Sequence, residues 1–454
     1  MKNYDLAIIG SGPGGYVAAL YASRRKLKVC VIEKGLVGGT CLNRGCIPTK
    51  SLLNSASMIT VIKEASAFGV DTGSVSIKFD KMMSRKDETV LKLRTGIETL
   101  FRANSIDLIR GQARISGPDT VTVPGAEDIY AKNMLIAAGS KTTSLNTIKT
   151  DEADILSSDG ILSLRSAPKS LVIIGGGVIG CEFAGLFNTL GTKVTVVEFM
   201  DRLVPNLSCE ISKKLELLFK KRGIEVFASS GAESAEKKQG VAVKISGGKV
   251  IETEKVFVAV GRTPDIESLG LADCGIKTEK NRIAVDEHLM TSVKGIYAIG
   301  DCVGGPLLAH KASYDGILAC DNILGDSRKV DYSNVPNCIW TDPEIACVGL
   351  TEEEAKSRVS GVKIAKFPYL ASGKAFLMGK PEGFIKIIGD TAGNVLGVEI
   401  FGAGACELIA EAVLAKTMGI NIKDWARAVH GHPTLSEIIQ EAAHIFCGTP
   451  IHSI

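Results

Sequence analysis

Residues 4–33, "YDLAIIGSGPGGYVAALYASRRKLKVCVIE", carry the pattern that decides the fold. The segment is typical of a strand, a glycine turn, a helix and a second strand, in the order "YDLAIIG", "GSGPGG", "GYVAALYASRRK" and "LKVCVIE". The turn has the spacing G-x-G-x-x-G at Gly10, Gly12 and Gly15, and the second strand ends at Glu33. This arrangement is typical of a dinucleotide-binding unit.

The same plan occurs again later in the chain, where "SLVIIGGG" precedes a helical segment and "TKVTVVE". Gly175, Gly177 and Gly180 repeat the spacing, and in both copies the acid, here Glu198, follows the first glycine by 23 residues. The first glycine allows a tight turn, the second admits a pyrophosphate, and the third lets the helix pack on the strand, while the acid binds a ribose. One such spacing is weak evidence, but two complete copies predict two dinucleotide sites.

Two carboxylates indicate which dinucleotides are bound. Glu198 suits a free 2′-hydroxyl and repels a 2′-phosphate, so NAD is expected rather than NADP, although Arg202 lies nearby. Much later, "GIYAIGDC" at residues 295–302 is typical of a strand that ends at Asp301. That carboxylate could hold the ribityl chain of a flavin or could cap a turn, and spacing alone leaves both interpretations open.

The size and composition fit a globular protein of about two to four domains. The 454 residues carry a formal charge of only +3, with basic residues spread along the chain, which indicates neither a nucleic-acid nor a membrane partner. The first strand starts within four residues, which leaves no room for a signal peptide. The apolar run that begins at Leu171 could resemble a membrane span, but glycines and Glu182 interrupt it, so no membrane-spanning helix is expected there. We therefore expect a cytoplasmic protein that binds small molecules.

The segment "GGTCLNRGCIPTK", residues 38–50, places Cys41 and Cys46 five positions apart. No second Cys or His pair at ligand spacing lies nearby, so neither zinc nor another metal is expected. A structural disulfide around so short a loop would contribute only about 2 kcal/mol and would be opposed by a reducing cytosol, which favours a redox role. Residues five apart in a regular helix are separated by a rise of about 7.5 Å, beyond the ~4.4–6.8 Å between the Cα atoms of bridged cysteines. If the two are bonded, we therefore expect an irregular helix start, which Gly45 and Pro48 would allow, and a strained disulfide that opens readily.

The sequence resembles the class I pyridine nucleotide-disulfide oxidoreductases over essentially its whole length. The resemblance is carried by six motifs in order, which are the first G-x-G-x-x-G, "GGTCLNRGCIPTK", "GGGVIGCE", "VGRTP" at 260–264, "YAIGD" and "HGHPTLSE" at 430–437. It implies an α/β fold with two Rossmann-like domains and a C-terminal α+β dimerisation domain. The implied order is an FAD domain at 1–142, an NAD domain at 143–267, a central domain at 268–334 and an interface domain at 335–454 of a homodimer.

The resemblance also implies the cofactor contacts. FAD would be bound by the first fingerprint and by residues along the chain, namely Gly10, Gly12, Gly14, Gly15, Glu33, Lys50, Ala113, Asp301 and Ala309. NAD would be bound by the second fingerprint and a later turn, namely Gly175, Gly177, Gly180, Glu198, Gly261 and Arg262.

The resemblance implies unequal roles for the two sulfurs, with Cys41 exchanging with substrate and Cys46 contacting the flavin. Lys50, four residues after Cys46, would lie beside the flavin and pair with Glu182. From the residues alone, Lys50 could instead be a solvated lysine, and Glu182 a first-turn acid favoured by the helix dipole.

Thiol exchange requires a proton acceptor, and the resemblance implies His432 in "HGHPTLSE", oriented by Glu437 and contributed by the other subunit. Glu437 could instead belong to a capping box with Thr434, because "TLSE" precedes a helical segment. We favour the histidine partner because a carboxylate beside an imidazole is the usual arrangement of a base.

The members that this sequence resembles most oxidise dihydrolipoyl groups carried by a protein of a 2-oxo acid dehydrogenase complex or of the glycine cleavage system. Two alternatives are another NAD(P)H-dependent reductase of a small disulfide, and a docking or redox-sensing subunit that only retains its cofactors. The presence of Cys41, Cys46 and His432 together favours an enzyme over the second alternative.

Overall fold

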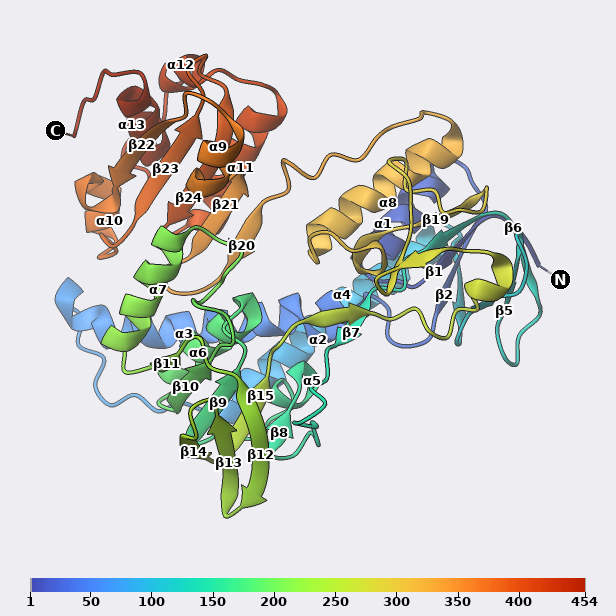
Figure 1. Ribbon diagram of the computed structural model, residues 1–454, viewed down its shortest axis with the longest axis horizontal. Helices are drawn as coiled ribbons and strands as arrows, with labels where there is room; N and C mark the ends of the chain where they lie inside the picture. The colour runs from blue at the N-terminus through green and yellow to red at the C-terminus, as the bar shows by residue number, and fades with distance from the viewer. Residues whose placement is uncertain (1, 454) are drawn as a thin grey trace. The chain divides into compact units, whose positions relative to one another are not determined.

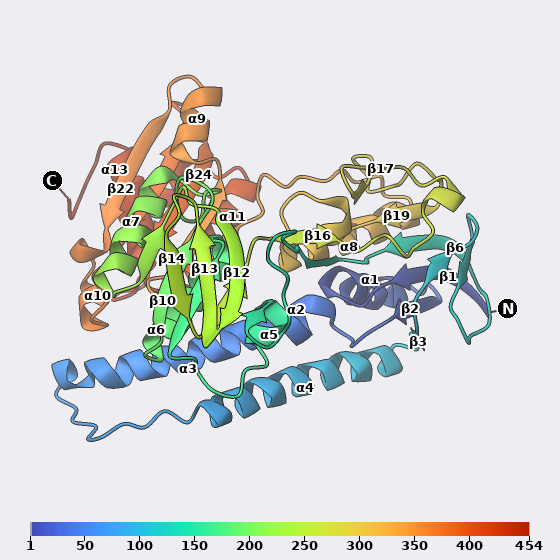
Figure 2. The ribbon, with the colours of Figure 1, turned by 60° about the horizontal axis from the view of Figure 1, so that its bottom comes forward.

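The computed structural model describes residues 2–453 as two compact units (Figures 1 and 2). Unit 1 contains residues 2–168 and 255–330, and unit 2 contains residues 169–254 and 331–453. Each unit holds one of the two expected strand-turn-helix-strand segments, so the predicted α/β class is confirmed. The division into four domains stays a prediction.

Unit 1 is built on a sheet of seven strands, six of them in the order β3-β2-β1-β6-β5-β4, with β19 also paired to β6. The strands β3, β2, β1, β6 and β19 are mutually parallel, and β4 and β5 form an antiparallel extension. Their bounds are β1 Lys2–Ile9, β2 Val29–Glu33, β3 Asp107–Arg110, β4 Arg114–Ile115, β5 Thr120–Thr122, β6 Ile129–Ile136 and β19 Ile296–Ala298. Central strands such as β2 are buried along their whole length, as expected of parallel strands covered on both faces.

Helices cover this sheet and extend beyond it. In Figure 1, α1 and α8 lie next to each other beside the sheet, and Figure 2 shows the long helices α3 and α4 side by side. The bounds in unit 1 are α1 Pro13–Arg24, α2 Gly39–Arg44, α3 Cys46–Glu64, α4 Phe79–Ala103, α5 Ser158–Ile161 and α8 Ala309–Leu324. Unit 1 also contains three short pairs. They are antiparallel β7 Ser140–Thr142 with β16 Arg262–Pro264, parallel β8 Ile155–Leu156 with β15 Lys255–Val258, and antiparallel β17 Thr278–Glu279 with β18 Arg282–Ile283.

Unit 2 begins with the second copy of the nucleotide-binding pattern. The strands β9 Ser170–Ile174, β10 Lys193–Val197 and β11 Glu225–Phe227 are parallel, and an antiparallel sheet follows with β12 Ala232–Lys238, β13 Gly240–Ile245 and β14 Val250–Thr253. The apolar run that begins at Leu171 is thus divided between β9, a glycine turn and α6 Val178–Thr189. Within residues 2–453, no helix is both long and apolar enough to cross a membrane.

The C-terminal part of unit 2 is an antiparallel sheet of five strands in the order β20-β21-β24-β23-β22. Alternate residues of β23, such as Ile385 and Ile387, face a core that α11 and α13 complete. The strand bounds are β20 Asn337–Ile339, β21 Ile345–Gly349, β22 Lys363–Pro368, β23 Phe384–Gly389 and β24 Val395–Phe401. The helices of unit 2 after α6 are α7 Cys209–Lys221, α9 Glu352–Arg358, α10 Gly373–Leu377, α11 Ala405–Thr417, α12 Ile422–Ala426 and α13 Glu437–Phe446.

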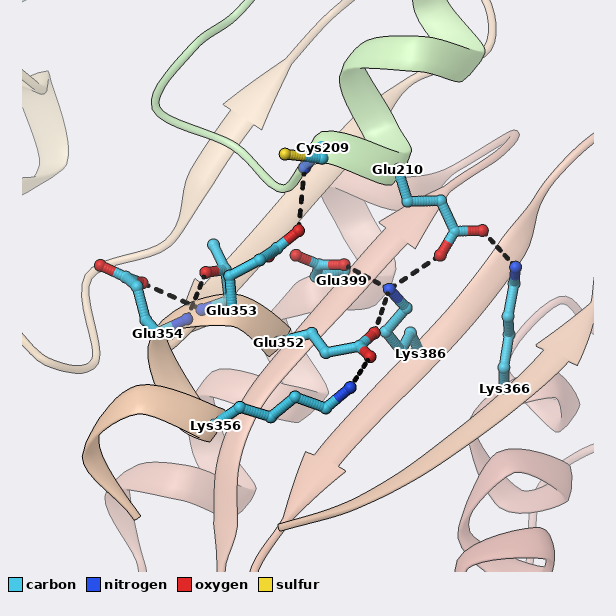
Figure 3. A network of polar contacts seen from close by, with 10 residues as sticks. Cys209, Glu210, Glu352, Glu353, Glu354, Lys356, Lys366, Lys386 and Glu399 are labelled. Carbon is cyan, nitrogen blue, oxygen red and sulfur yellow. Dashed lines mark hydrogen bonds and ion pairs between the residues drawn. The ribbon is translucent and has the colours of Figure 1, made fainter.

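Lys386 lies between Ile385 and Ile387 and therefore points to the opposite face of this sheet, where it is buried among three carboxylates (Figure 3). Its Nζ is 2.8 Å from Glu210 on α7, 2.9 Å from Glu352 on α9 and 3.3 Å from Glu399, its cross-strand partner on β24. Burial alone would lower the pKa of Lys386, but the hydrogen bonds to Glu210 and Glu352 outweigh it and hold that pKa above its ordinary value.

We predict that Lys386→Met will strongly destabilise unit 2. Removal of the ammonium leaves the buried Glu399 without its countercharge, and breaking a buried ion pair in this way costs about 3–5 kcal/mol. The exposed pair of Lys356 with Glu352 provides a matched control, because Lys356→Met should cost only about 0.3–0.5 kcal/mol. Urea unfolding measures both effects, and equal midpoints for the two variants would contradict the prediction.

Candidate redox and dinucleotide sites

The first and third glycines of both fingerprints are required by the backbone itself. Gly10 and Gly175 have φ values of +102° and +111°, which side chains rarely allow. A Cβ at Gly15 would lie 1.9 Å from the Gly10 carbonyl oxygen, and a Cβ at Gly180 would lie 1.9 Å from that of Gly175. The tight turn and the close helix packing predicted from the spacing are therefore both present, twice.

The second glycines have a different environment, because they border open space. A Cβ at Gly12 would approach no described atom more closely than Gly39 Cα at 4.0 Å, and one at Gly177 would meet none within 4 Å. These glycines are the N-cap residues of α1 and α6, so neither N-cap position carries a side chain that could cap its helix. A helix start with open space in front of it fits a pyrophosphate, so the residues present fit FAD and NAD.

The two acids make the same pair of contacts in the two copies. Glu33 Oε2 accepts from the Ser11 backbone N–H at 2.8 Å and Oε1 from that of Gly35 at 2.7 Å. Glu198 Oε2 accepts from the Gly176 N–H at 2.5 Å and Oε1 from that of Met200 at 2.6 Å. Each carboxylate thus joins the glycine turn to the segment after its strand, at the place where a ribose is expected.

The structure places three other expected FAD contacts in unit 1. A Cβ at Gly14 would lie 2.8 Å from both the Ala312 carbonyl oxygen and Ile299 Cδ1, so this glycine serves the packing of α1 on α8. Ala113 is buried between β3 and β4, and Ala309 is the first residue of α8. Their contacts with FAD stay predictions.

Asp301 belongs to a hydrogen-bonded chain that the sequence did not reveal. Ser140 Oγ donates to Asp301 Oδ2 at 2.5 Å, and Arg262 donates from Nε to Ser140 Oγ at 2.8 Å and from Nη2 to Ser140 O at 2.6 Å. Burial lowers the pKa of Arg262, and the Asp301 carboxylate opposes that effect. Arg262, expected beside NAD, therefore lies beside the residue expected to hold the flavin, while Gly261 accepts from the Thr143 N–H.

The cysteine segment shows the expected irregularity. Cys41 lies in α2 and Cys46 begins α3, and Gly45 interrupts the helix between them with φ −143° and ψ −113°. A Cβ at Gly45 would lie 3.0 Å from the Thr40 carbonyl oxygen and 3.2 Å from Cys41 Cα, so the chain folds back closely on Cys41. Only glycine permits this approach without a displacement of the backbone.

The structure holds Cys41 and Cys46 as two thiols and not as a disulfide, which is the reduced form of the pair. The pKa of Cys41 lies well above its ordinary value, first because its thiol is hydrogen-bonded to Cys46 and next because it is buried, while the Lys50 ammonium acts in the opposite direction. Cys41 therefore holds its proton in the hydrogen bond with Cys46. The disulfide form of the pair and the roles of the two sulfurs stay predictions.

Glu182 is buried in α6, where Trp340 N–H donates to its Oε1 at 3.0 Å. Glu182 is the fifth residue of α6, so the alternative of an acid in the first turn of this helix is wrong. Its burial with a backbone donor indicates a structural position. The expected pairing of Glu182 with Lys50 stays a prediction.

The His432 loop answers the question that the sequence left open about Glu437. His432 Nδ1 lies 2.8 Å from Glu437 Oε1, and the Thr434 N–H donates to Glu437 Oε2 at 2.8 Å, so the carboxylate serves both partners. Thr434 Oγ1 bonds Gly431 O and Ser436 instead of the helix, so a full capping box is not formed. Because Glu437 accepts from Nδ1–H, Nε2 of a neutral ring is left as the proton acceptor. The His432 side chain is 80% exposed.

His430 anchors this loop and was missed as a functional residue. Its side chain is only 6% exposed, with Nε2 2.9 Å from Glu411 Oε1 on α11 and Nδ1 3.0 Å from the Ala428 carbonyl oxygen. Contacts at both ring nitrogens fix the orientation of this side chain. Trp425 Nε1 also donates to Glu411 Oε1, at 2.6 Å. In the sequence, only the proximity of His430 to His432 in "HGHPTLSE" could have indicated a role for His430. Its partner Glu411 lies in a different helix, so the contact itself could not be predicted.

Comparisons with known proteins agree with this geometry. Residues 4–316 match the family model described as pyridine nucleotide-disulphide oxidoreductase, and residues 335–443 match the dimerisation domain of that family. The chain is 41% identical to a dihydrolipoyl dehydrogenase of Bacillus subtilis (strain 168), over 99% of each protein. It is 40% identical to the dihydrolipoyl dehydrogenase of Geobacillus stearothermophilus, over 99% of this chain and 97% of that protein.

Solved structures are similar as well. The protein LpdA of Mycobacterium tuberculosis is 27% identical with a TM-score of 0.92, over 98% of this chain and 99% of that one. A HOCl-induced flavoprotein disulfide reductase of Escherichia coli, solved as a Cu(II) complex, has a TM-score of 0.89 at 27% identity, over 98% of this chain and 100% of that one.

The glycine environments predict opposite behaviour for two alanine variants. Gly177→Ala should fold normally, because its Cβ enters open space, but should raise KM for NAD at least about tenfold, equivalent to ~1.4 kcal/mol, because the methyl group occupies the phosphate position. Gly180→Ala should lower the melting temperature, because its Cβ meets the Gly175 carbonyl oxygen. Thermal unfolding and NAD kinetics distinguish the two, and a Gly177→Ala variant with unchanged KM would contradict the assignment.

Proposed function

Because the chain belongs to the pyridine nucleotide-disulphide oxidoreductase family, we propose that it is a dihydrolipoamide dehydrogenase, a homodimeric flavoprotein that oxidises dihydrolipoyl groups and reduces NAD. The observation that carries the proposal is the contact of the Cys41 and Cys46 thiols across the break at Gly45, in a chain about 40% identical to dihydrolipoyl dehydrogenases over nearly its full length. The dimerisation domain supports the dimer.

The reaction begins at the disulfide form of the pair. A thiolate of the dihydrolipoyl group attacks Cys41, which forms a mixed disulfide and releases the Cys46 thiolate. The second dihydrolipoyl sulfur then displaces Cys41, so that a lipoyl disulfide leaves and both cysteines hold the two electrons as a dithiol. FAD, when bound, supplies the electron-accepting ring between this dithiol and NAD. The products are a lipoyl disulfide, NADH and a proton.

His432 is proposed as the proton acceptor for the incoming dithiol. Glu437 fixes the ring through Nδ1, so the free Nε2 can take a thiol proton, and the carboxylate stabilises the imidazolium that results. Burial raises the pKa of Glu437, but the hydrogen bonds from His432 and the Thr434 N–H outweigh it and leave that pKa below its ordinary value. The Glu437 carboxylate therefore stays charged while His432 accepts and releases the thiol proton. As in the family that the sequence resembles, His432 would come from the partner subunit.

Cofactor choice and biological partner complete the proposal. Glu198, which accepts from two backbone N–H groups at the second glycine turn, disfavours a 2′-phosphate and supports NAD over NADP. The substrate group would be carried by a lipoyl-bearing protein of a 2-oxo acid dehydrogenase complex or of the glycine cleavage system. A cytoplasmic location is proposed with it.

A rival activity, the reduction of another small disulfide with NADPH, is tested in the same experiment. The holoenzyme should form NADH from dihydrolipoamide and NAD far faster than it oxidises NADPH with glutathione disulfide. Activity with only the second pair of substrates would overturn the proposal.

Replacement of either active-site sulfur provides the sharpest test of the chemistry. Cys41→Ser and Cys46→Ser should each lower dihydrolipoamide-dependent NADH formation by about 10³-fold or more, as when an essential nucleophile is removed. Oxidation of NADH by ferricyanide should persist in both variants, because it requires flavin but no disulfide. Cys209→Ser, at a half-buried cysteine in α7, should retain normal activity. Normal lipoyl turnover in either active-site variant would contradict the mechanism.

The proton acceptor makes a separate prediction. His432→Ala should lower kcat by about 10²–10⁴-fold. Glu437→Gln should lower kcat less and should move the acidic limb of its pH profile to lower pH, because the imidazolium form loses the carboxylate that stabilises it. A lower kcat with an unchanged pH profile would show that Glu437 acts only through the structure of the Thr434 turn.

A further inference from the structure

A second pair of cysteines meets in unit 2, where no motif of the sequence pointed to it. Cys338 lies on β20, at the edge of the five-stranded sheet, and Cys406 is the second residue of α11, which packs on that sheet. Both residues are half-buried, so the pair is neither sealed in the core nor fully solvated.

The contacts of the two sulfurs interlock. Cys406 Sγ lies 3.8 Å from the carbonyl oxygen of Ile339, which follows Cys338, and 3.8 Å from that of Ile345, which pairs with Ile339 across the sheet. Cys338 Sγ in turn lies 4.0 Å from the carbonyl oxygen of Cys406. Each sulfur therefore contacts the backbone at or next to the other cysteine. The two thiols are also in contact with each other.

The surroundings distinguish the two thiols. The pKa of Cys406 is raised above its ordinary value, first by the hydrogen bond that its thiol makes with Cys338, next by burial and then by the charge of Glu344. Cys406 therefore holds its proton more strongly than an ordinary thiol. Glu344 Oε2 accepts from the Cys406 N–H at 2.9 Å, and burial raises the pKa of this carboxyl group, which makes it a better proton acceptor.

A third cysteine on the neighbouring strand is excluded by the pleat of the sheet. Cys338 is opposite Ala346, whose side chain faces the core under α11, whereas Cys347 is opposite Asn337 and Glu399. Successive residues of a strand point to opposite faces, so Cys347 faces away from Cys406. The pair is therefore Cys338 with Cys406.

We propose that Cys338 and Cys406 form a second redox-active dithiol, which exchanges with small-molecule disulfides and closes to a Cys338–Cys406 disulfide between β20 and α11. The Cys338 thiolate attacks one sulfur of the small disulfide, forms a mixed disulfide and releases one thiolate. Cys406 passes its proton to Glu344 and attacks Cys338 Sγ, and the second thiol leaves. The small disulfide gains the two electrons that the dithiol loses, so the exchange is balanced.

Peptide mapping of the FAD-containing dimer tests this proposal independently of the lipoyl reaction. The protein is reduced, freed of reductant, incubated anaerobically with glutathione disulfide, quenched with iodoacetamide and cleaved after glutamate, which separates Cys338 from Cys347 at Glu344. We expect the alkylation of Cys338 and Cys406 to be lost together, with a disulfide-linked peptide pair that contains both. Retention of both alkylated thiols, or a link between Cys338 and Cys347, would overturn the proposal.

Two variants sharpen the result. Cys406→Ser should leave Cys338 as a lasting glutathione adduct, because the resolving thiol is gone, while Cys347→Ser should leave the cross-link unchanged. Normal dihydrolipoamide oxidation by Cys406→Ser would confirm that this variant is folded. An equal yield of the glutathione adduct on wild-type Cys338 would contradict the proposal, because it would show that Cys406 does not resolve it.

Discussion

The close return of the chain at Gly45 is the constraint on which the redox chemistry of unit 1 depends. A regular helix would hold Cys41 and Cys46 too far apart for their sulfurs to meet, and the break brings Gly45 back against the Cys41 backbone and the two thiols into contact. Since α3 then continues as a regular helix, it also places Lys50 about one turn beyond Cys46. A single position without a side chain therefore sets both the sulfur contact and the charge beside it.

The two nucleotide-binding segments solve one physical problem twice. Both turns need a positive φ at the first glycine and a missing Cβ at the third, and both leave the second glycine facing open space. In both copies the acid accepts hydrogen bonds from backbone N–H groups at equivalent positions, one in the glycine turn and one two residues after the acid. These repeated contacts explain why the glycine spacing and the acid 23 residues later were sufficient to predict both sites.

The residues that the sequence could not reveal are those whose partners come from distant elements. His430 carries no signal for Glu411, and Asp301 carries none for Ser140, because these contacts form only after helices and strands pack. Lys386 likewise carries no signal for Glu210 or Glu352, because these carboxylates come from α7 and α9. Glu437 was treated as a choice between two partners, whereas a carboxylate has two oxygens and serves both.

In the proposed reaction, Cys41 and Cys46 cycle between disulfide and dithiol as the dihydrolipoyl substrate is oxidised. Alkylation of the anaerobic holoenzyme, measured for each cysteine-containing peptide, reports that state before and after the addition of one equivalent of dihydrolipoamide without NAD. Both cysteines should resist alkylation before the addition, and both should be fully alkylated after it. Equal alkylation of the two cysteines before and after the addition would contradict the proposed cycle.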